Sequence, residues 1–410
     1  MSDDNAATLS LLNAAAVRTR ANRMLALGLD EKLPNFRVDL ARLDDAADLV
    51  VATTRKNYPS LDVPFHSRWR HFVVDGKDRS AAIAANTSDP AARARSAFDL
   101  AIVSVLLDAG AGARWHYRDA ATDRRFGRSE GLALASLDMF ARGVFSSDAT
   151  RNPLRADAAA LVQVDTAALS NGFQSAADNQ LVGLAGRAAL LRGLGNLAAA
   201  RPDIFARNDT PRPGGFFDHL AAEAGNGTIP APLILSELLQ QFGPIWPSRL
   251  TLGGVALGDC WRHPAMVTAD ATSELVPLHK LSQWLAYSLI EPLQQAGFKI
   301  TDIDGLTGLA EYRNGGLFVD TGVLTLRDAH AARRAHEVGS ALIVEWRALT
   351  VALLDRLALA VRTRLDKDAS TLPLAKVLEG GSWAAGRELA FARRADGSPP
   401  IKVISDGTVF

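Results

Sequence analysis

Three chemically active side chains stand together just before a pair of glycines. Glu311, Tyr312 and Arg313 supply a carboxylate, a phenol and a guanidinium group, and Gly315 and Gly316 follow after one residue. Glycine allows a backbone to approach a ligand closely, so this turn can present polar groups to a small molecule. A carboxylate placed there can orient water or stabilise developing positive charge. The alternative interpretation is a capped surface turn with an ion pair.

A second carboxylate, Glu345, stands in the apolar stretch 339–350. At helical spacing it shares a face with alanine and leucine side chains. An unpaired buried charge is very costly, so Glu345 is expected to be either paired or functional. An ion pair with Arg313 or Arg347 and a role in catalysis are the two interpretations.

Residues 65–72, FHSRWRHF, concentrate aromatic rings and basic groups. Such a segment can combine stacking faces with hydrogen-bond donors, as recognition of a polar planar ligand requires. The candidate substrate-binding residues here are His66, Arg68, Trp69 and His71. An aromatic strand with a solvated basic face explains the same pattern equally well.

The stretch 317–322, LFVDTG, resembles the phosphate-binding loop of phosphoribosyltransferases. In those enzymes an apolar strand ends in two adjacent acidic residues before Thr-Gly, whereas this stretch has only Asp320. The doubly wound α/β pattern around such a loop is also missing. Phosphoribosyl transfer, with Asp320 in the binding loop, is therefore kept as the alternative function.

Two further motifs are better explained as turns. The glycines of 106–112 follow a predicted helix, whereas an S-adenosylmethionine-binding turn requires a strand before it. Cys260 and His263 have the spacing C-x-x-H, but no second pair follows at zinc-ligand distance. The sequence therefore predicts neither a metal site nor a cofactor.

Composition narrows the classes of protein that the chain can belong to. Its 410 residues are 48% hydrophobic and 22% charged, which is ordinary for a globular protein with a core. Lys plus Arg and Asp plus Glu both number 45, so the chain lacks the basic surplus of a nucleic-acid-binding protein. Cys260 is the single cysteine, which excludes an intrachain disulfide and agrees with a reducing compartment.

No membrane association is expected either. The longest strongly apolar run, 100–107, is 8 residues long, whereas a spanning helix needs about 18 or more. The first residues, MSDDNAATLS, lack the basic and then apolar pattern of a signal peptide. We therefore expect a cytoplasmic protein whose partner is a small molecule; the sequence specifies no oligomeric state.

Helix signals dominate the elements that must position these residues. Asp89 and Pro90 form a helix start and Gly110 a stop, so the sequence predicts a buried helix over 90–109. The fold class is mainly α with a few short strands. Helices are also expected at 6–27, 40–53, 129–142, 156–168, 178–199, 231–241, 277–296 and 329–365, and strands at 71–74, 317–319 and 401–404.

The glycine- and proline-rich stretch 211–230 is expected to separate two lobes. The first, 1–230, is helical and contains the aromatic and basic segment. The second, 231–410, contains the candidate carboxylates. One integrated domain is the alternative. In the second lobe an amphipathic helix interrupted by Pro292 precedes the glycine-containing connection 303–309.

Long strings of the chain resemble the uracil-catabolism protein family of fungi and bacteria, long designated a domain of unknown function. That resemblance implies a place in pyrimidine breakdown by ring opening, with ribosylurea as the expected product of the opening step. The strings are SVLLDAGAG (104–112), RSEGLALAS (128–136), PLHKLSQWLAYSLIEPLQ (277–294), LTGLAEYRNGGLFVDTGVL (306–324), VGSALIVEWRALTVALLD (338–355), EGGSWAAGRELA (379–390) and SDGTVF (405–410).

A second resemblance is to the queuosine-salvage nucleoside glycosylases, which are mainly helical with a helix-hairpin-helix core like that of DNA glycosylases. It covers 279–314 and the later stretch 344–347. Residues 280 and 283 match a Lys-Arg-Ala-Gln string in part, Glu311-Tyr312-Arg313 falls on an Asp-Tyr-Arg string, and Asn314 departs from it. The resemblance implies a helix-hairpin-helix part around 277–316. It also implies ligand contacts by His279, Gln283, Tyr312, Arg313 and Arg347, with Glu311 and Glu345 as the catalytic pair.

Together these resemblances imply hydrolysis of the N-glycosidic bond of ribosylurea or a related N-riboside. Breaking that bond gives the sugar oxocarbenium character, which a placed carboxylate stabilises while it orients water. The expected substrate is small and nucleoside-like. The alternatives are a phosphoribosyl-handling enzyme and a non-catalytic partner in the pathway.

Overall fold

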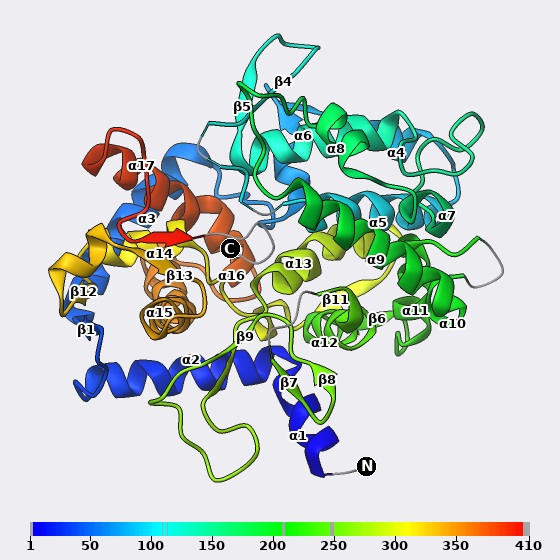
Figure 1. Ribbon diagram of the computed structural model, residues 1–410. Coiled ribbons are helices and arrows are strands. Elements are labelled where there is room, and N and C mark those ends of the chain that lie inside the picture. Colours follow the sequence, from blue (N-terminus) through cyan, green and yellow to red (C-terminus); the bar gives the residue numbers. More distant parts are fainter. Residues whose placement is uncertain (1–2, 109, 113, 207–209, 247–249, 405–410) are drawn as a thin grey trace. The chain divides into compact units, whose positions relative to one another are not determined.

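The computed structural model describes residues 3–108, 110–112, 114–206, 210–246 and 250–404 (Figure 1). The chain divides into two compact units, each built from segments distant in sequence. Unit 1 takes its residues from Met1–His66, Ser248–Gln283 and Asp302–Ser405, and unit 2 takes its residues from Ser67–Pro247 and Trp284–Thr301.

Helices dominate both units, which confirms the mainly α prediction. No helix among the described residues combines the length and apolarity needed to cross a membrane. Unit 1 contains α1 (Asp3–Leu11), α2 (Ala14–Leu29), α3 (Leu43–Asn57), α14 (Tyr312–Asp320), α15 (Ala341–Leu365), α16 (Leu374–Val377) and α17 (Trp383–Arg393). Unit 2 contains α4 (Ala81–Ala85), α5 (Pro90–Leu106), α6 (Arg128–Ala141), α7 (Ala158–Leu161), α8 (Thr166–Gly172), α9 (Leu184–Ala200), α10 (Pro202–Phe205), α11 (Phe216–Ala222) and α12 (Ala231–Gln241). Helix α13 (Lys280–Gln295) belongs to both units: its residues up to Gln283 are assigned to unit 1, and those from Trp284 onward to unit 2.

Strands in the described ranges pair only two by two, so no doubly wound parallel sheet forms there. The antiparallel pairs are β1 (Phe36–Val38) with β12 (Leu324–Leu326), β2 (Val73–Val74) with β3 (Lys77–Asp78), β4 (His116–Arg118) with β5 (Arg125–Gly127), β7 (Thr251–Leu252) with β8 (Val255–Ala256), and β9 (Cys260–Arg262) with β10 (Leu275–Pro277). The parallel pairs are β6 (Thr228–Pro230) with β11 (Lys299–Thr301) and β13 (Ala335–Glu337) with β14 (Lys402–Ile404).

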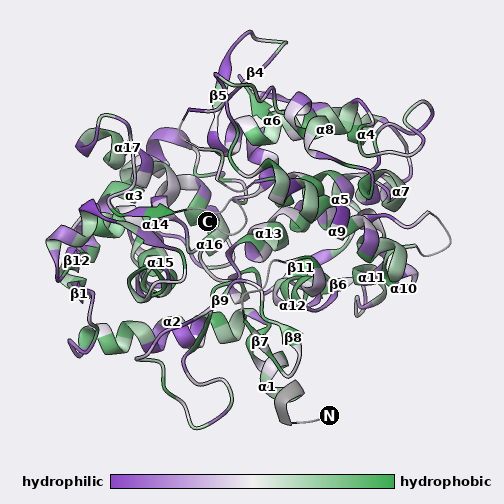
Figure 2. Cartoon of the chain, in the orientation of Figure 1, coloured by the Kyte–Doolittle hydropathy of each residue, from purple (hydrophilic) through white to green (hydrophobic). Residues whose placement is uncertain are grey.

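Helix α15 is the central element of unit 1 and is buried along most of its length. It packs against α2, α3 and α14. In α2 the buried residues recur every three or four positions, from Ala14 to Gly28, and Figure 2 shows hydrophobic and hydrophilic residues alternating along this helix. This periodicity is what an amphipathic helix needs to cover a core element.

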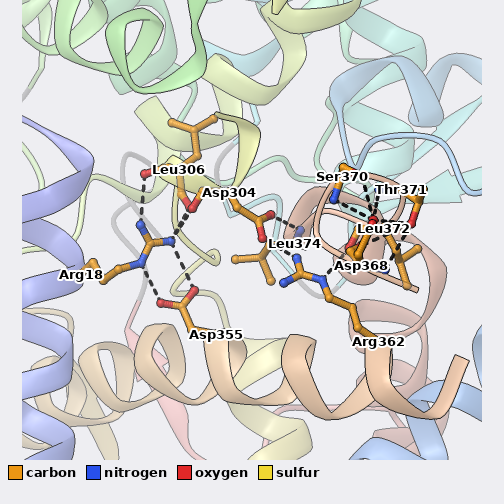
Figure 3. A network of polar contacts seen from close by, with 11 residues as sticks. Arg18, Asp304, Leu306, Asp355, Arg362, Asp368, Ser370, Thr371, Leu372 and Leu374 are labelled. Atoms are coloured by element: carbon orange, nitrogen blue, oxygen red, sulfur yellow. Dashed lines mark hydrogen bonds and ion pairs between the residues drawn. The ribbon is translucent and has the colours of Figure 1, made fainter. Parts of the chain in front are cut away.

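A polar network fixes the turn that leads into α14 (Figure 3). Arg18 of α2 donates to Asp355 of α15 at 2.8 Å and to the backbone carbonyls of Asp304 and Leu306 at 2.8 and 2.7 Å. The carboxylate of Asp304 accepts from Arg362 at 2.5 Å and from the Leu374 backbone at 2.6 Å. The turn is therefore held by α2 and α15 together.

Sequence patterns predicted some element boundaries and missed others. The helix at 90–109 is α5, with residue 109 outside the described residues, and the helix at 231–241 is α12. The strand expected at 317–319 is wrong, because these residues lie in α14. The helix expected at 329–365 begins only at Ala341, because residues 335–337 pair with β14. The helix-hairpin-helix around 277–316 stays a prediction.

Candidate functional site

Glu311 caps the N-terminus of α14. Its two carboxylate oxygens accept from the backbone N–H groups of Arg313 and Asn314, at 2.9 and 2.6 Å. The side chain is buried, with 9% of the residue exposed. Each carboxylate oxygen has a second lone pair, so the capped group can still accept from a ligand or a water molecule. The positive end of the helix dipole stabilises negative charge at this position.

Two hydrogen-bond donors next to this carboxylate have no partner within the described ranges. Arg313 Nη1 and Asn314 Nδ2 are buried, and no group among the described residues accepts from either. Leaving a buried donor unsatisfied costs about 1–3 kcal/mol, and native structures therefore leave few. The two donors are thus positioned to bind an acceptor-rich molecule.

The remaining atoms of these two side chains are held in place. The Arg313 guanidinium carbon lies 4.1 Å from the centre of the Trp383 ring, which is a cation–π arrangement. Arg313 Nε donates to the hydroxyl of Tyr312 at 3.3 Å. Asn314 Oδ1 accepts from the hydroxyl of Ser382 at 2.9 Å. The orientation of the unpartnered atoms is therefore fixed by the protein.

Glycines allow the elements around this site to approach closely. Residues Leu378–Ser382 form a single π-helical turn, which is a frequent feature of functional sites. A Cβ atom on Gly381 would lie 2.5 Å from the Val50 carbonyl oxygen of α3, and one on Gly386 would overlap the Arg313 carbonyl. The glycines at these positions thus bring α3 and α17 against the residues that carry the site.

A histidine–carboxylate pair lies near Trp383. His66 Nδ1 is 2.7 Å from Glu379 Oε2, and the Tyr58 hydroxyl donates to Glu379 Oε1 at 3.1 Å. The ring centres of His66 and Trp383 are 6.2 Å apart. We call the residues of this region the cap cluster: Glu311, Arg313, Asn314, Ser382, Trp383, Glu379 and His66.

The second predicted catalytic residue, Glu345, has protein contacts at both carboxylate oxygens. One carboxylate oxygen accepts from the backbone N–H groups of Asn35 and Phe36, at 3.2 and 2.7 Å. The other accepts from the Asn35 amide at 2.9 Å and lies 3.4 Å from His263 Nε2. The neighbour of this carboxylate is thus His263, and neither Arg313 nor Arg347 pairs with it among the described residues; Glu345 holds the start of β1.

Arg347 is bound to Asp259 in a bidentate ion pair, with distances of 2.9 and 2.8 Å. Burial raises the pKa of Asp259, but the charge and hydrogen bonds of Arg347 and the hydrogen bond from Trp261 lower it to about 2. Lys280 also donates to this carboxylate through its backbone N–H, at 2.9 Å. The pair therefore joins α15, β9 and the start of α13.

His279 and Gln283, expected to contact the ligand, make contacts within unit 1. His279 has a left-handed backbone, with φ of 46°, and its Nε2 donates to the Leu11 carbonyl at 3.0 Å. Its Nδ1 has no partner among the described residues, and burial lowers the pKa of the ring. Gln283 Oε1 accepts from the Thr307 backbone at 3.0 Å, and its amide donates to the Thr307 hydroxyl.

Asp320 lies at the end of α14 and pairs with Arg394 at 2.8 and 2.5 Å. A phosphoribosyl-binding loop requires the residues before the aspartate to form a strand, and here they are helical. The strand that a phosphoribosyl-binding loop needs before its aspartate therefore does not form at residues 317–320.

The other candidates of the segment 65–72 belong to unit 2, where each has a structural partner. Arg68 is fully buried and pairs with Asp108 at 2.8 Å. Burial lowers the pKa of its guanidinium group, although the negative charge of Asp108 acts to raise it. Its guanidinium also lies 3.3 Å from His71 Nδ1. Trp69 Nε1 donates to the Ser288 carbonyl at 2.7 Å. That carbonyl has no helical partner, because Pro292 four residues later lacks an N–H.

Some members of the cap cluster were not identified from the sequence as site residues. Asn314 was noted only as a departure from the glycosylase string, and Glu379, Ser382 and Trp383 only within a family string. The doublet Gly380-Gly381 was the available signal, since adjacent glycines in a helical region indicate close packing or a ligand.

Each comparison with known proteins matches nearly the whole chain. The model of a family described as a protein of unknown function, DUF1688, matches residues 10–410. A protein of Schizosaccharomyces pombe named Protein urg3 is 39% identical over 413 residues, covering 98% of each chain. A protein of Lachancea kluyveri named Uracil catabolism protein 4 is 37% identical over 415 residues, covering 92% of each chain.

Proposed function

The chain belongs to the DUF1688 family, and we propose that it acts in uracil catabolism as a hydrolase of the N-glycosidic bond of ribosylurea. The name of the Lachancea kluyveri relative supports the pathway. The observation that carries the reaction is the pair of buried, unpartnered donors, Arg313 Nη1 and Asn314 Nδ2, beside the capped carboxylate of Glu311.

Ribosylurea presents what these groups bind. Its ribose hydroxyls and urea carbonyl are acceptors for the two donors, and it carries no charge that the site must neutralise. The unpaired lone pairs of Glu311 accept from water or from a ribose hydroxyl. Because the backbone N–H groups fix the carboxylate, its orientation requires little rearrangement during the reaction.

In the proposed reaction the bond between the anomeric carbon and the urea nitrogen breaks while the oxygen of water bonds to that carbon. Glu311 stabilises the positive charge on the sugar and accepts the proton that the water loses. The urea nitrogen leaves with a proton, for which His66 is the proposed donor. Its hydrogen bond with Glu379 fixes the orientation of the ring. The products are ribose and urea.

The test is to incubate the purified protein with ribosylurea in water enriched in oxygen-18 and to follow both products by mass spectrometry. We expect ribose and urea in equal amounts, with the label entering ribose at the anomeric carbon during turnover. Since free ribose also exchanges this oxygen slowly, unlabelled ribose kept in the same water is the control. Absence of both products would contradict the proposal, and turnover only of uracil with phosphoribosyl pyrophosphate would favour the alternative.

A further inference from the structure

A polar cavity of about 600 Å³ lies in unit 2, between the β4–β5 hairpin and the loop that follows α8. The hairpin side contributes Arg114, His116, Arg118 and Arg125. The loop side contributes two amide side chains and one carboxylate, that of Asp178. None of these residues belongs to the cap cluster.

The alternation of a β-ribbon places the basic groups on one face. His116 and Arg118 are two residues apart, and Arg118 is paired directly with Arg125 across the hairpin. The intervening Tyr117 is buried and donates its hydroxyl to Asp138 of α6. The hairpin therefore packs one face on unit 2 and presents cationic side chains on the other.

The opposite wall is attached firmly to the hairpin edge. The Asn179 side chain accepts from the His116 N–H at 2.9 Å and donates to the His116 carbonyl at 2.8 Å. Gln174 makes the equivalent two bonds to the backbone of Arg118, at 2.9 and 3.0 Å. These amides form hydrogen bonds with the backbone N–H and C=O groups at the outer edge of β4, as a third strand would. They thereby hold the loop against the hairpin.

The charges in the cavity are incompletely balanced. Arg118 pairs with Asp123 at 2.5 Å, and the carboxylate of Asp178 brings a further negative charge to the lining, so the guanidinium groups of Arg114 and Arg125 leave the cavity with a net positive charge. The side chains of Arg114, His116 and Arg125 have no hydrogen-bond or ion-pair partner among the described residues. Like charges directly opposite each other in a ribbon are destabilising, and Arg118 and Arg125 stand in that relation. A bound anion would remove this repulsion.

We propose that this cavity binds a small organic phosphate of about the size of a nucleoside monophosphate. Guanidinium groups bind phosphate oxygens in bidentate fashion, and three of them surround one space here. The volume lies within the range of small-molecule pockets and exceeds what a phosphate ion needs. This site is separate from the proposed hydrolytic site and does not depend on it.

The test is titration calorimetry of the full chain with uridine 5′-monophosphate, ribose 5-phosphate, uridine and inorganic phosphate. We expect both organic phosphates to bind, and uridine not to bind. Arg114→Gln and Arg125→Gln should each weaken binding by about 10- to 100-fold, as expected for a charge-assisted hydrogen bond. Arg55→Gln, an exposed arginine of α3, is the matched control and should leave binding unchanged.

Three outcomes would overturn the proposal. The first is that neither organic phosphate binds at millimolar concentration. The second is that both arginine variants bind as the wild type does, which would place the ligand elsewhere. The third is that inorganic phosphate or single-stranded RNA binds more tightly than the organic phosphates. Melting temperatures of the variants check that loss of binding does not reflect loss of folding.

Discussion

Glu311 and Glu345 are both buried carboxylates of unit 1, and their neighbours differ in one respect. Around Glu345, Asn35 and Phe36 donate to both oxygens, and His263 Nε2, which makes no hydrogen bond within the described residues, lies 3.4 Å from one of them. The carboxylate of Glu311 is also hydrogen-bonded, but two donors beside it, Arg313 Nη1 and Asn314 Nδ2, have no partner in the part of the chain that the structure describes. Burial of a charged group therefore does not by itself distinguish a structural position from a binding position. The distinguishing feature of Glu311 is that two different side chains beside it, those of Arg313 and Asn314, carry donors without a partner, whereas the unbonded nitrogen beside Glu345 lies 3.4 Å from that carboxylate.

The largest stability effect is expected in the region of Glu345. Asp259→Asn leaves the buried guanidinium of Arg347 without its counter-charge. Breaking such a pair from one side costs about 3–5 kcal/mol, and urea unfolding followed by circular dichroism measures it. A loss below about 1 kcal/mol would mean that Arg347 is not dependent on Asp259.

A smaller loss is expected for Glu345→Gln. The new amide retains one acceptor oxygen but turns a donor towards the Asn35 amide and His263. Unfolding free energy should fall by about 1–3 kcal/mol, whereas hydrolysis of ribosylurea by the folded fraction should fall far less than in Glu311→Gln. Equal loss of turnover in the two variants would remove the distinction between the two carboxylates.

Asn314→Ala removes one of the unpartnered donors. If Nδ2 binds the substrate, KM for ribosylurea should rise by about tenfold, the effect of one hydrogen bond. The matched control is Ser382→Ala, which breaks the same Ser382–Asn314 bond but retains the Asn314 donor. A similar KM for both variants would show that Nδ2 makes no contact with the substrate.

The smallest effect is a pH dependence from His279. Burial lowers the pKa of this ring, so its contribution to stability is complete above the ordinary histidine pKa of about 6.5 and is lost as the pH falls through the folded-state value. His279→Asn keeps a residue that tolerates the left-handed backbone. Unfolding free energies at about pH 7.5 and about pH 5.5 should differ less in the variant than in the wild type. An unchanged difference would contradict this assignment.

The fold was predictable where local signals agree. The cap Asp89 with Pro90 defines the first residue of α5, and the apolar face that follows defines its course, although the helix ends at Leu106, before the predicted stop. Residues 317–319 misled the prediction, because an apolar run of this length suits a strand or a helix equally. The deciding feature was the capping carboxylate of Glu311 six residues earlier, which starts α14.

The candidate site was predictable only in part. The sequence identified Glu311 and Arg313, because they precede a glycine pair, and it offered the capped turn as the alternative use of Glu311. It did not predict that Asp259 would pair with Arg347 across 88 positions of the chain, or that Trp383 would lie on Arg313. Such partners depend on packing between elements distant in sequence, which no local pattern records.

The role of Glu311 is tested most directly by the turnover of ribosylurea in Glu311→Gln. The substitution keeps the size of the side chain and removes its charge, with a stability cost of about 1 kcal/mol for a weakened cap. We expect turnover to fall by at least about 100-fold while the protein remains folded, and Glu311→Asp, which retains the charge, to fall less. Turnover near that of the wild type in Glu311→Gln would contradict the proposed role.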